Sequence, residues 1–111
     1  MVYQIRFTER ADKSIDSCLD YLLYQVESTG NPQAAKNFMK DFEQTLNILK
    51  VSANSFPFYE DERLRKKGFY KIHFLHHNYK IFYRIDEDMV IIEIIMHDLQ
   101  DYQNILQEDF S

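Results

Sequence analysis

Basic side chains alternate with apolar ones in the last third of the chain. Lys71 and His73 have the same parity in one apolar run, and Lys80 and Arg84 have the same parity in the next. Successive side chains of a β-strand point to opposite faces, so these four would lie on one side of a sheet. Because like charges repel, the pattern predicts an anionic neighbour. Three candidates are Glu93 on the following run, an acidic segment of a partner protein, and RNA.

A second basic cluster precedes this region, within residues 53–68, the longest stretch without a clear period. We expect a loop here, with room for a turn of helix. Three acidic residues precede the bases, so one interpretation is a solvated, self-neutralised loop. The other is an element that binds a target or a partner protein. Under that interpretation the binding residues are Arg63, Arg65, Lys66 and Lys67, together with Arg84.

Histidine and cysteine give weaker signals. His76 and His77 are adjacent in a predicted turn, where their side chains point in different directions, and no cysteine or spaced carboxylate completes a metal site. We expect exposed turn residues and no cofactor. Cys18 lies on an apolar helical stripe and is expected to be a small buried hydrophobe rather than a reactive thiol. A single cysteine makes no internal disulfide, which fits a reducing cytoplasm.

The elements that position these residues follow from the hydrophobic periodicity. Alternation predicts strands, and apolar residues at steps of three and four predict two amphipathic helices, the first capped by Thr8. The short connection between the helices makes them an antiparallel hairpin, which covers the apolar face of the sheet. The expected elements are a strand at 1–7, helices at 8–29 and 31–52, a loop at 53–68, an antiparallel three-stranded meander at 69–98, and a tail or short helix at 99–111.

Length and composition suit one α+β domain. The chain has 111 residues, of which 45% are hydrophobic, enough for one packed core. The first residues alternate like a strand and contain no long apolar run, so we expect no signal peptide or membrane span. The formal net charge of −5 argues against a protein that coats nucleic acid non-specifically.

Beyond these patterns, the sequence resembles the RelE/ParE superfamily of bacterial type II toxin–antitoxin systems, including the plasmid stabilisation family. The residues that carry the resemblance span nearly the whole chain. They are YQIRFTERA at 3–11, GNPQAAKNF at 30–38, YEDERLRKKG at 59–68, NYKIFYRI at 78–85 and MHDLQDY at 96–102. The resemblance implies the RelE/ParE-like toxin fold, a helical hairpin on a small antiparallel sheet. It also implies growth inhibition and a cognate antitoxin that neutralises the toxin in a hetero-oligomer.

The superfamily divides by mechanism. RelE-like members are similar to ribosome-dependent endoribonucleases that cut messenger RNA, which requires a base, an acid and cations around the phosphate. By this resemblance the catalytic residues are Lys71, His73, Lys80, His97 and Tyr102. The arginine expected after the last strand is absent, because the segment reads HDLQ at 97–100.

ParE-like members lack that catalytic set and inhibit DNA gyrase through protein contacts. The absent arginine and the acidic composition favour this branch, so we expect a toxin that binds an essential target such as gyrase. A ribosome-dependent ribonuclease is the alternative. A degenerate toxin that only binds its antitoxin is the second alternative. Whether the chain is an enzyme stays open at this point.

Overall fold

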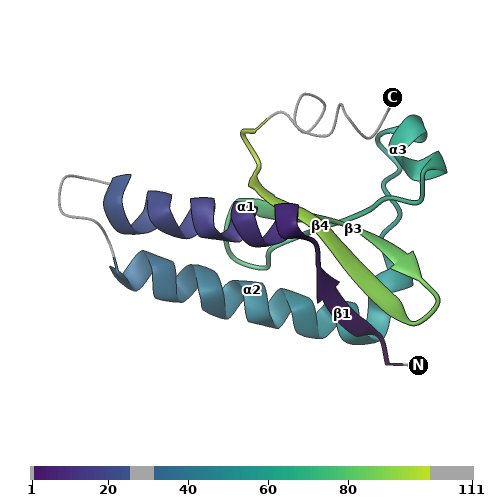
Figure 1. Cartoon of the computed structure of the whole chain (residues 1–111), viewed down its shortest axis with the longest axis horizontal. Coiled ribbons are helices and arrows are strands. Elements are labelled where there is room, and N and C mark those ends of the chain that lie inside the picture. The colour runs from purple at the N-terminus through teal and green to yellow at the C-terminus, as the bar shows by residue number, and fades with distance from the viewer. Residues whose placement is uncertain (1, 26–31, 101–111) are drawn as a thin grey trace.

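The chain folds into a helical hairpin on one side of a four-stranded sheet, with a shorter helix on the other side (Figure 1). The computed structural model describes residues 2–25 and 32–100. The elements are β1 (Gln4–Phe7), α1 (Glu9–Asp20), a π-helical turn (Tyr21–Gln25), α2 (Pro32–Ser52), a 3₁₀ turn (Ala53–Ser55), α3 (Glu62–Lys66), β2 (Tyr70–His73), β3 (Tyr79–Asp86) and β4 (Met89–His97). Within the described part of the chain, no helix is long and apolar enough to span a membrane.

The sheet has the order β1-β4-β3-β2 and is mixed rather than wholly antiparallel. The antiparallel meander β2-β3-β4 matches the sequence prediction. β1 joins it parallel to β4, with Gln4 opposite Met89. A parallel pair needs a long crossover, and here the helical hairpin and two strands supply it. A bulge next to Tyr83 leaves Glu93 of β4 without a cross-strand partner.

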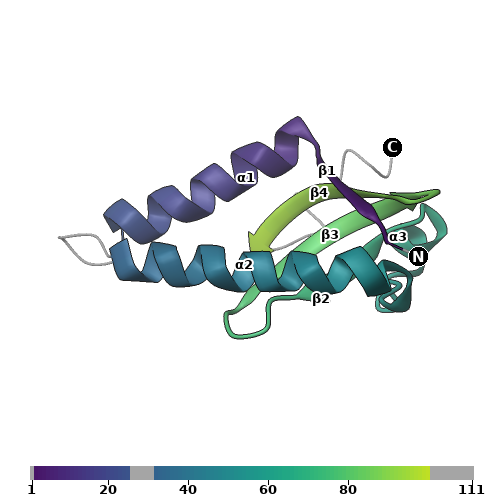
Figure 2. The same cartoon turned by 90° about the horizontal axis from the view of Figure 1, so that it is seen from below.

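The helical hairpin buries the face of the sheet that the sequence marked as apolar. Ile72, Phe74, Ile81 and Tyr83 are all buried there, as predicted. The hydroxyl of Thr8 accepts the first-turn N–H of α1 at 3.0 Å, which confirms the predicted cap. The two helices run antiparallel and side by side (Figures 1 and 2). The helix predicted at 8–29 becomes a π-helical turn from Tyr21, and its last four residues lie outside the described part of the chain.

The opposite face of the sheet carries a second core, which corrects the expectation that this face is basic. Phe58, Leu64 and Phe69 pack there against Phe82 and two residues of β4, and each is at most 1% exposed. Phe82 lies between Lys80 and Arg84 on this face, so the face has an apolar centre. Without a cover, that centre would be exposed to water. The predicted loop at 53–68 therefore contains α3, held over that centre by its buried side chains.

Candidate binding surfaces

A groove of about 630 Å³ lies between α1 and the C-terminal half of β4. Its walls are mostly apolar and include Tyr21, Tyr79, Ile94, Met96 and Leu99. Leu99 is 90% exposed and Tyr21 is 55% exposed, so two large hydrophobic side chains at this groove are open to water. Exposed apolar surface in a concave site is typical of a docking surface for a partner. We refer to it as the α1–β4 groove.

The same groove runs along an open edge of the sheet. β1 ends opposite the middle of β4, so among the described residues no strand pairs with the rest of β4 on that side. Side chains take the place of a strand there. The hydroxyl of Ser14 accepts the N–H of Ile95 at 3.0 Å, and the side-chain oxygen of Gln100 accepts the N–H of His97 at 2.8 Å. These bonds satisfy two backbone N–H groups of the strand edge, which could otherwise pair with an extended chain.

One thiol lines this groove. Cys18 lines it and is half-buried, where the sequence predicted full burial. Burial raises the pKa of its thiol to about 11, so the thiol is protonated and a weak nucleophile near neutral pH. Burial also raises the pKa of Tyr79 to about 12.

The residues that the sequence matched to a ribonuclease are divided between the two faces of the sheet. Lys71, His73 and Lys80 share one face, and His73 lies opposite Lys80 across β2 and β3. His97 pairs with Tyr79 on the helix-covered face, with the two ring centroids 5.1 Å apart. The remaining member, Tyr102, lies outside the described residues.

Two of these basic side chains are engaged within the molecule. The ammonium of Lys71 is 3.0 Å from a carboxylate oxygen of Glu60 and 4.8 Å from the centroid of the Phe58 ring. Lys80 is only 8% exposed. His73 is exposed, and its Nδ1 is 3.5 Å from a carboxylate oxygen of Asp98.

The anionic neighbour predicted for the basic face is Glu93. Arg84 forms an ion pair with it, and the Arg84 Nε donates to a Glu93 oxygen at 2.6 Å. Arg10 of α1 approaches the other carboxylate oxygen at 3.9 Å. The Arg84 guanidinium also lies 4.9 Å from the ring centroid of Phe69. Arg84 therefore joins β3 to the bulge of β4 and is separate from the other predicted binding residues.

Those other residues lie on α3 and at its C-cap, Lys67, and their side chains are exposed. Arg65 lies 5.7 Å from the ring centroid of Tyr59, which is itself 69% exposed. Lys66 forms an exposed ion pair with Glu62, one turn earlier. We define the basic platform as Tyr59, Arg63, Arg65, Lys66 and Lys67, all of them exposed.

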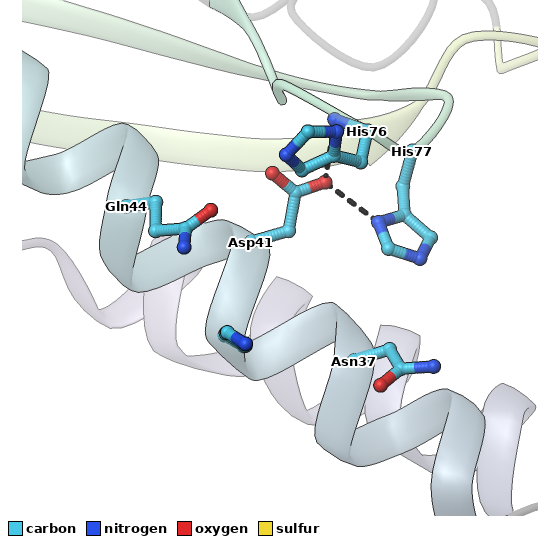
Figure 3. Close-up of a pocket in the computed structure, with 6 residues that line it drawn as sticks. Asn37, Asp41, Gln44, His76 and His77 are labelled. Carbon is cyan, nitrogen blue, oxygen red and sulfur yellow. Dashed lines mark hydrogen bonds and ion pairs between the residues drawn. The ribbon is translucent and has the colours of Figure 1, made fainter.

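A buried carboxylate under the β2–β3 turn was missed from the sequence (Figure 3). Asp41 of α2 is 2% exposed and accepts the backbone N–H groups of Leu75 and His76, each at 3.0 Å. Nδ1 of His77 is 2.6 Å from the same carboxylate. Burial alone would raise the pKa of Asp41, but the hydrogen bonds from His77, His76 and Leu75 together lower it.

This site corrects part of the prediction for the turn. His76 is exposed as expected, whereas His77 is half-buried against Asp41. The sequence did carry a signal, because Asp41 lies on the buried stripe of α2 next to Phe42 and one turn before Thr45. Among the described residues, no three potential metal ligands come together.

The comparisons with known proteins agree with this architecture. The family model described as the ParE toxin of the type II toxin–antitoxin system parDE matches residues 5–102. This chain belongs to the ParE toxin family. It is therefore a type II toxin of the RelE/ParE superfamily. No sequence among the curated proteins matches it.

Solved structures resemble this ParE-family toxin in fold. One is described as the chromosomal ParDE system from P. aeruginosa, with 16% sequence identity, a TM-score of 0.67, and coverage of 86% of this chain and 96% of that chain. The isolated E. coli RelE toxin has 17% identity and a TM-score of 0.48, covering 96% and 98% of the two chains. A mutant E. coli RelE in complex with a peptide of the antitoxin RelBc has 16% identity and a TM-score of 0.43, covering 97% and 95%.

Proposed function

We propose that this ParE-family toxin arrests bacterial growth by binding an essential protein, with DNA gyrase as the first candidate, and that a cognate antitoxin neutralises it. The α1–β4 groove is the observation that supports an antitoxin partner. It combines exposed apolar side chains with a strand edge whose Ile95 and His97 N–H groups donate to side chains. An extended antitoxin segment can pair with β4 there and place alternate side chains against the apolar walls.

The positions of the predicted catalytic residues favour binding over cleavage. Lys71 and Lys80 are engaged or buried, and His97 lies on the other face of the sheet. A scissile phosphate needs its acid, base and cations within hydrogen-bond reach of one point. The absent arginine after β4 removes a further cation from that set. A toxin that acts through protein contacts requires none of these.

Growth and enzyme assays test the target. Inducing the chain alone in bacteria should arrest growth, and the purified toxin should inhibit supercoiling by gyrase. The variant His97→Ala should remain as toxic as the wild type. Normal growth despite soluble, folded protein would leave a degenerate toxin that binds only its antitoxin. Growth arrest with unaffected gyrase would direct the search to another essential protein.

A groove variant tests the antitoxin site, using a short acidic helical protein encoded beside the toxin gene as the probe. Ser17 lines the groove and is exposed, so Ser17→Arg places a bulky cation in it. Asn47→Arg makes the same charge change at an exposed position of α2 outside the groove. We expect the first variant to stay toxic when the antitoxin is co-expressed and the second to be neutralised. Equal neutralisation of both would place the antitoxin elsewhere.

A ribosome-dependent ribonuclease is the second candidate, and one observation favours it. His73 is exposed, lies opposite Lys80 and is 3.5 Å from Asp98, so a base, a cation and an orienting carboxylate adjoin on one face. Mapping messenger RNA ends after induction tests this candidate. Codon-phased cuts that disappear in His73→Ala would establish cleavage and overturn the binding mechanism.

A further inference from the structure

We propose that the basic platform on α3 is the surface through which the toxin holds its target, and that it binds an acidic segment of that protein. This inference rests on the proposed function and names the chemistry of the partner. The platform comprises Arg63, Arg65 and Lys66 of α3, Lys67 at its C-cap and Tyr59 before it, all of them exposed.

The platform is rigidly mounted, although its helix has only five residues. An isolated helix of that length does not form in water, so tertiary contacts must hold it. Leu64 of α3 belongs to the second core together with Phe58 and Phe69, and all three are at most 1% exposed. Asp61 caps the helix by accepting the N–H groups of Arg63 and Leu64. Cations fixed in this way lose less conformational entropy on binding than cations on a mobile loop.

The composition of the platform is that of a protein interface. An exposed tyrosine beside an arginine guanidinium, here Tyr59 and Arg65, combines two residue types that are enriched at interface hot spots. The sheet face beneath the platform is covered by its anchors, so the exposed cations are not required for packing. A large aromatic ring that is 69% exposed among cations needs a functional explanation more than scattered lysines do.

The charge of the whole chain selects the class of partner. Residues 59–67 hold four cations and three acids, in a chain with a net charge of −5. Glu60 pairs with Lys71 and Asp61 is buried as the helix cap, so the exposed surface of the platform is mainly positive although Lys66 pairs with Glu62. A local basic surface on an acidic body attracts an anionic group at short range. The overall negative charge opposes a long phosphate backbone, whose field extends over the whole molecule. A short acidic protein segment that contacts only the platform experiences less of that repulsion, because the more distant charges of the chain are screened.

The platform is separate from the antitoxin groove. No residue of α3 lines the α1–β4 groove. α3 lies at the right-hand end of the molecule in Figures 1 and 2, whereas α1 extends toward the left-hand end. Variants of the platform therefore test target binding without changing the proposed antitoxin site.

The test uses the whole toxin and three fluorescein-labelled probes in anisotropy titrations: a peptide of ten glutamates, a peptide of ten lysines, and a ten-nucleotide RNA. The platform variant is Arg63→Glu/Arg65→Glu/Lys66→Glu. The control, Lys36→Glu/Lys40→Glu/Lys50→Glu, makes the same charge change on the exposed side of α2. Arg63→Gln/Arg65→Gln/Lys66→Gln is the neutral comparison, and far-UV circular dichroism confirms that each variant is folded.

We expect the wild type and the α2 control to bind the glutamate peptide alike, and the platform variant to bind it at least tenfold more weakly. The difference should shrink as salt rises, because exposed charges are screened. In cells, the platform variant should lose toxicity while still binding the antitoxin.

Equal peptide binding by all variants would overturn the inference, as would tighter binding of the RNA through the same residues. If the platform variant arrests growth like the wild type, the inference fails while the proposed function stands. If the wild type itself does not arrest growth, the proposed function fails. The peptide titrations then test by themselves whether the platform binds acidic segments.

Discussion

Replacing Asp41 with asparagine tests how the β2–β3 turn is held. The carboxylate accepts three hydrogen bonds, from the backbone of Leu75 and His76 and from the ring of His77. A hydrogen bond to a charged group contributes about 1.5–3 kcal/mol. Asparagine keeps one oxygen but turns an NH₂ group toward a donor, so we expect Asp41→Asn to lower the free energy of unfolding by about 3 kcal/mol. For a domain of this size, that corresponds to a fall in Tm of about 12 °C.

The pKa of Asp41 determines how the stability loss in Asp41→Asn depends on pH. Hydrogen bonding lowers the pKa of Asp41 in the folded state below its ordinary value, so the folded state favours the charged carboxylate. Its contribution is complete above the unfolded pKa, near about 4, and is lost as pH falls through the lower folded pKa. The gap in stability between wild type and Asp41→Asn should therefore shrink as pH falls below about 4.

Urea unfolding followed by far-UV circular dichroism measures both quantities, since the chain has no tryptophan. His77→Ala is the matched comparison. It removes only one of the three bonds, from a side chain that is 37% exposed, and should cost about 1 kcal/mol. The reasoning is refuted if Asp41→Asn costs less than His77→Ala at pH 7. It is also refuted if the gap between wild type and Asp41→Asn is the same at pH 7 and pH 3.

Three further predictions concern the rest of the fold. Glu93→Gln should destabilise the protein by about 2 kcal/mol in urea, because Arg84 loses its buried ionic partner; an unchanged midpoint would contradict this. Leu64→Ala should cost about 3 kcal/mol and increase amide hydrogen exchange in α3, since this side chain anchors the helix; unaltered exchange there would argue against the anchor. Cys18 should react with iodoacetamide at least tenfold more slowly in folded than in unfolded protein at pH 7, because burial raises its pKa to about 11; equal rates would exclude that shift.

Local patterns predicted the elements well. The parity of residues 69–96 placed Ile72 and Tyr83 on the helix-covered face, and the Thr8 cap set the start of α1. Glu93 was one of three anionic neighbours proposed for the basic residues, and it pairs with Arg84. These predictions succeeded because each depends on the chemistry of neighbouring positions, which a strand or helix repeats with a fixed period.

The candidate sites were predicted less completely. The chemistry of α3 was visible as a run of charges, but its anchoring was not, because Phe58 and Phe69 flank the run rather than alternate within it. The α1–β4 groove depends on where β1 stops along β4, which no local pattern encodes. Asp41 and the turn it holds are at least 34 positions apart in the chain.

The sequence by itself determined the order of the strands and of the two long helices, the apolar face of the meander and the likeness to the toxin superfamily. Tertiary structure alone decided that β1 pairs parallel to β4, that α3 covers the basic face, and that Asp41 binds the β2–β3 turn. Periodicity reports which side of an element is buried, and it is fixed by bonds between near neighbours. Packing between segments that are distant in the chain decides which surfaces meet. A single carboxylate or phenylalanine contacts its partner only in the folded protein.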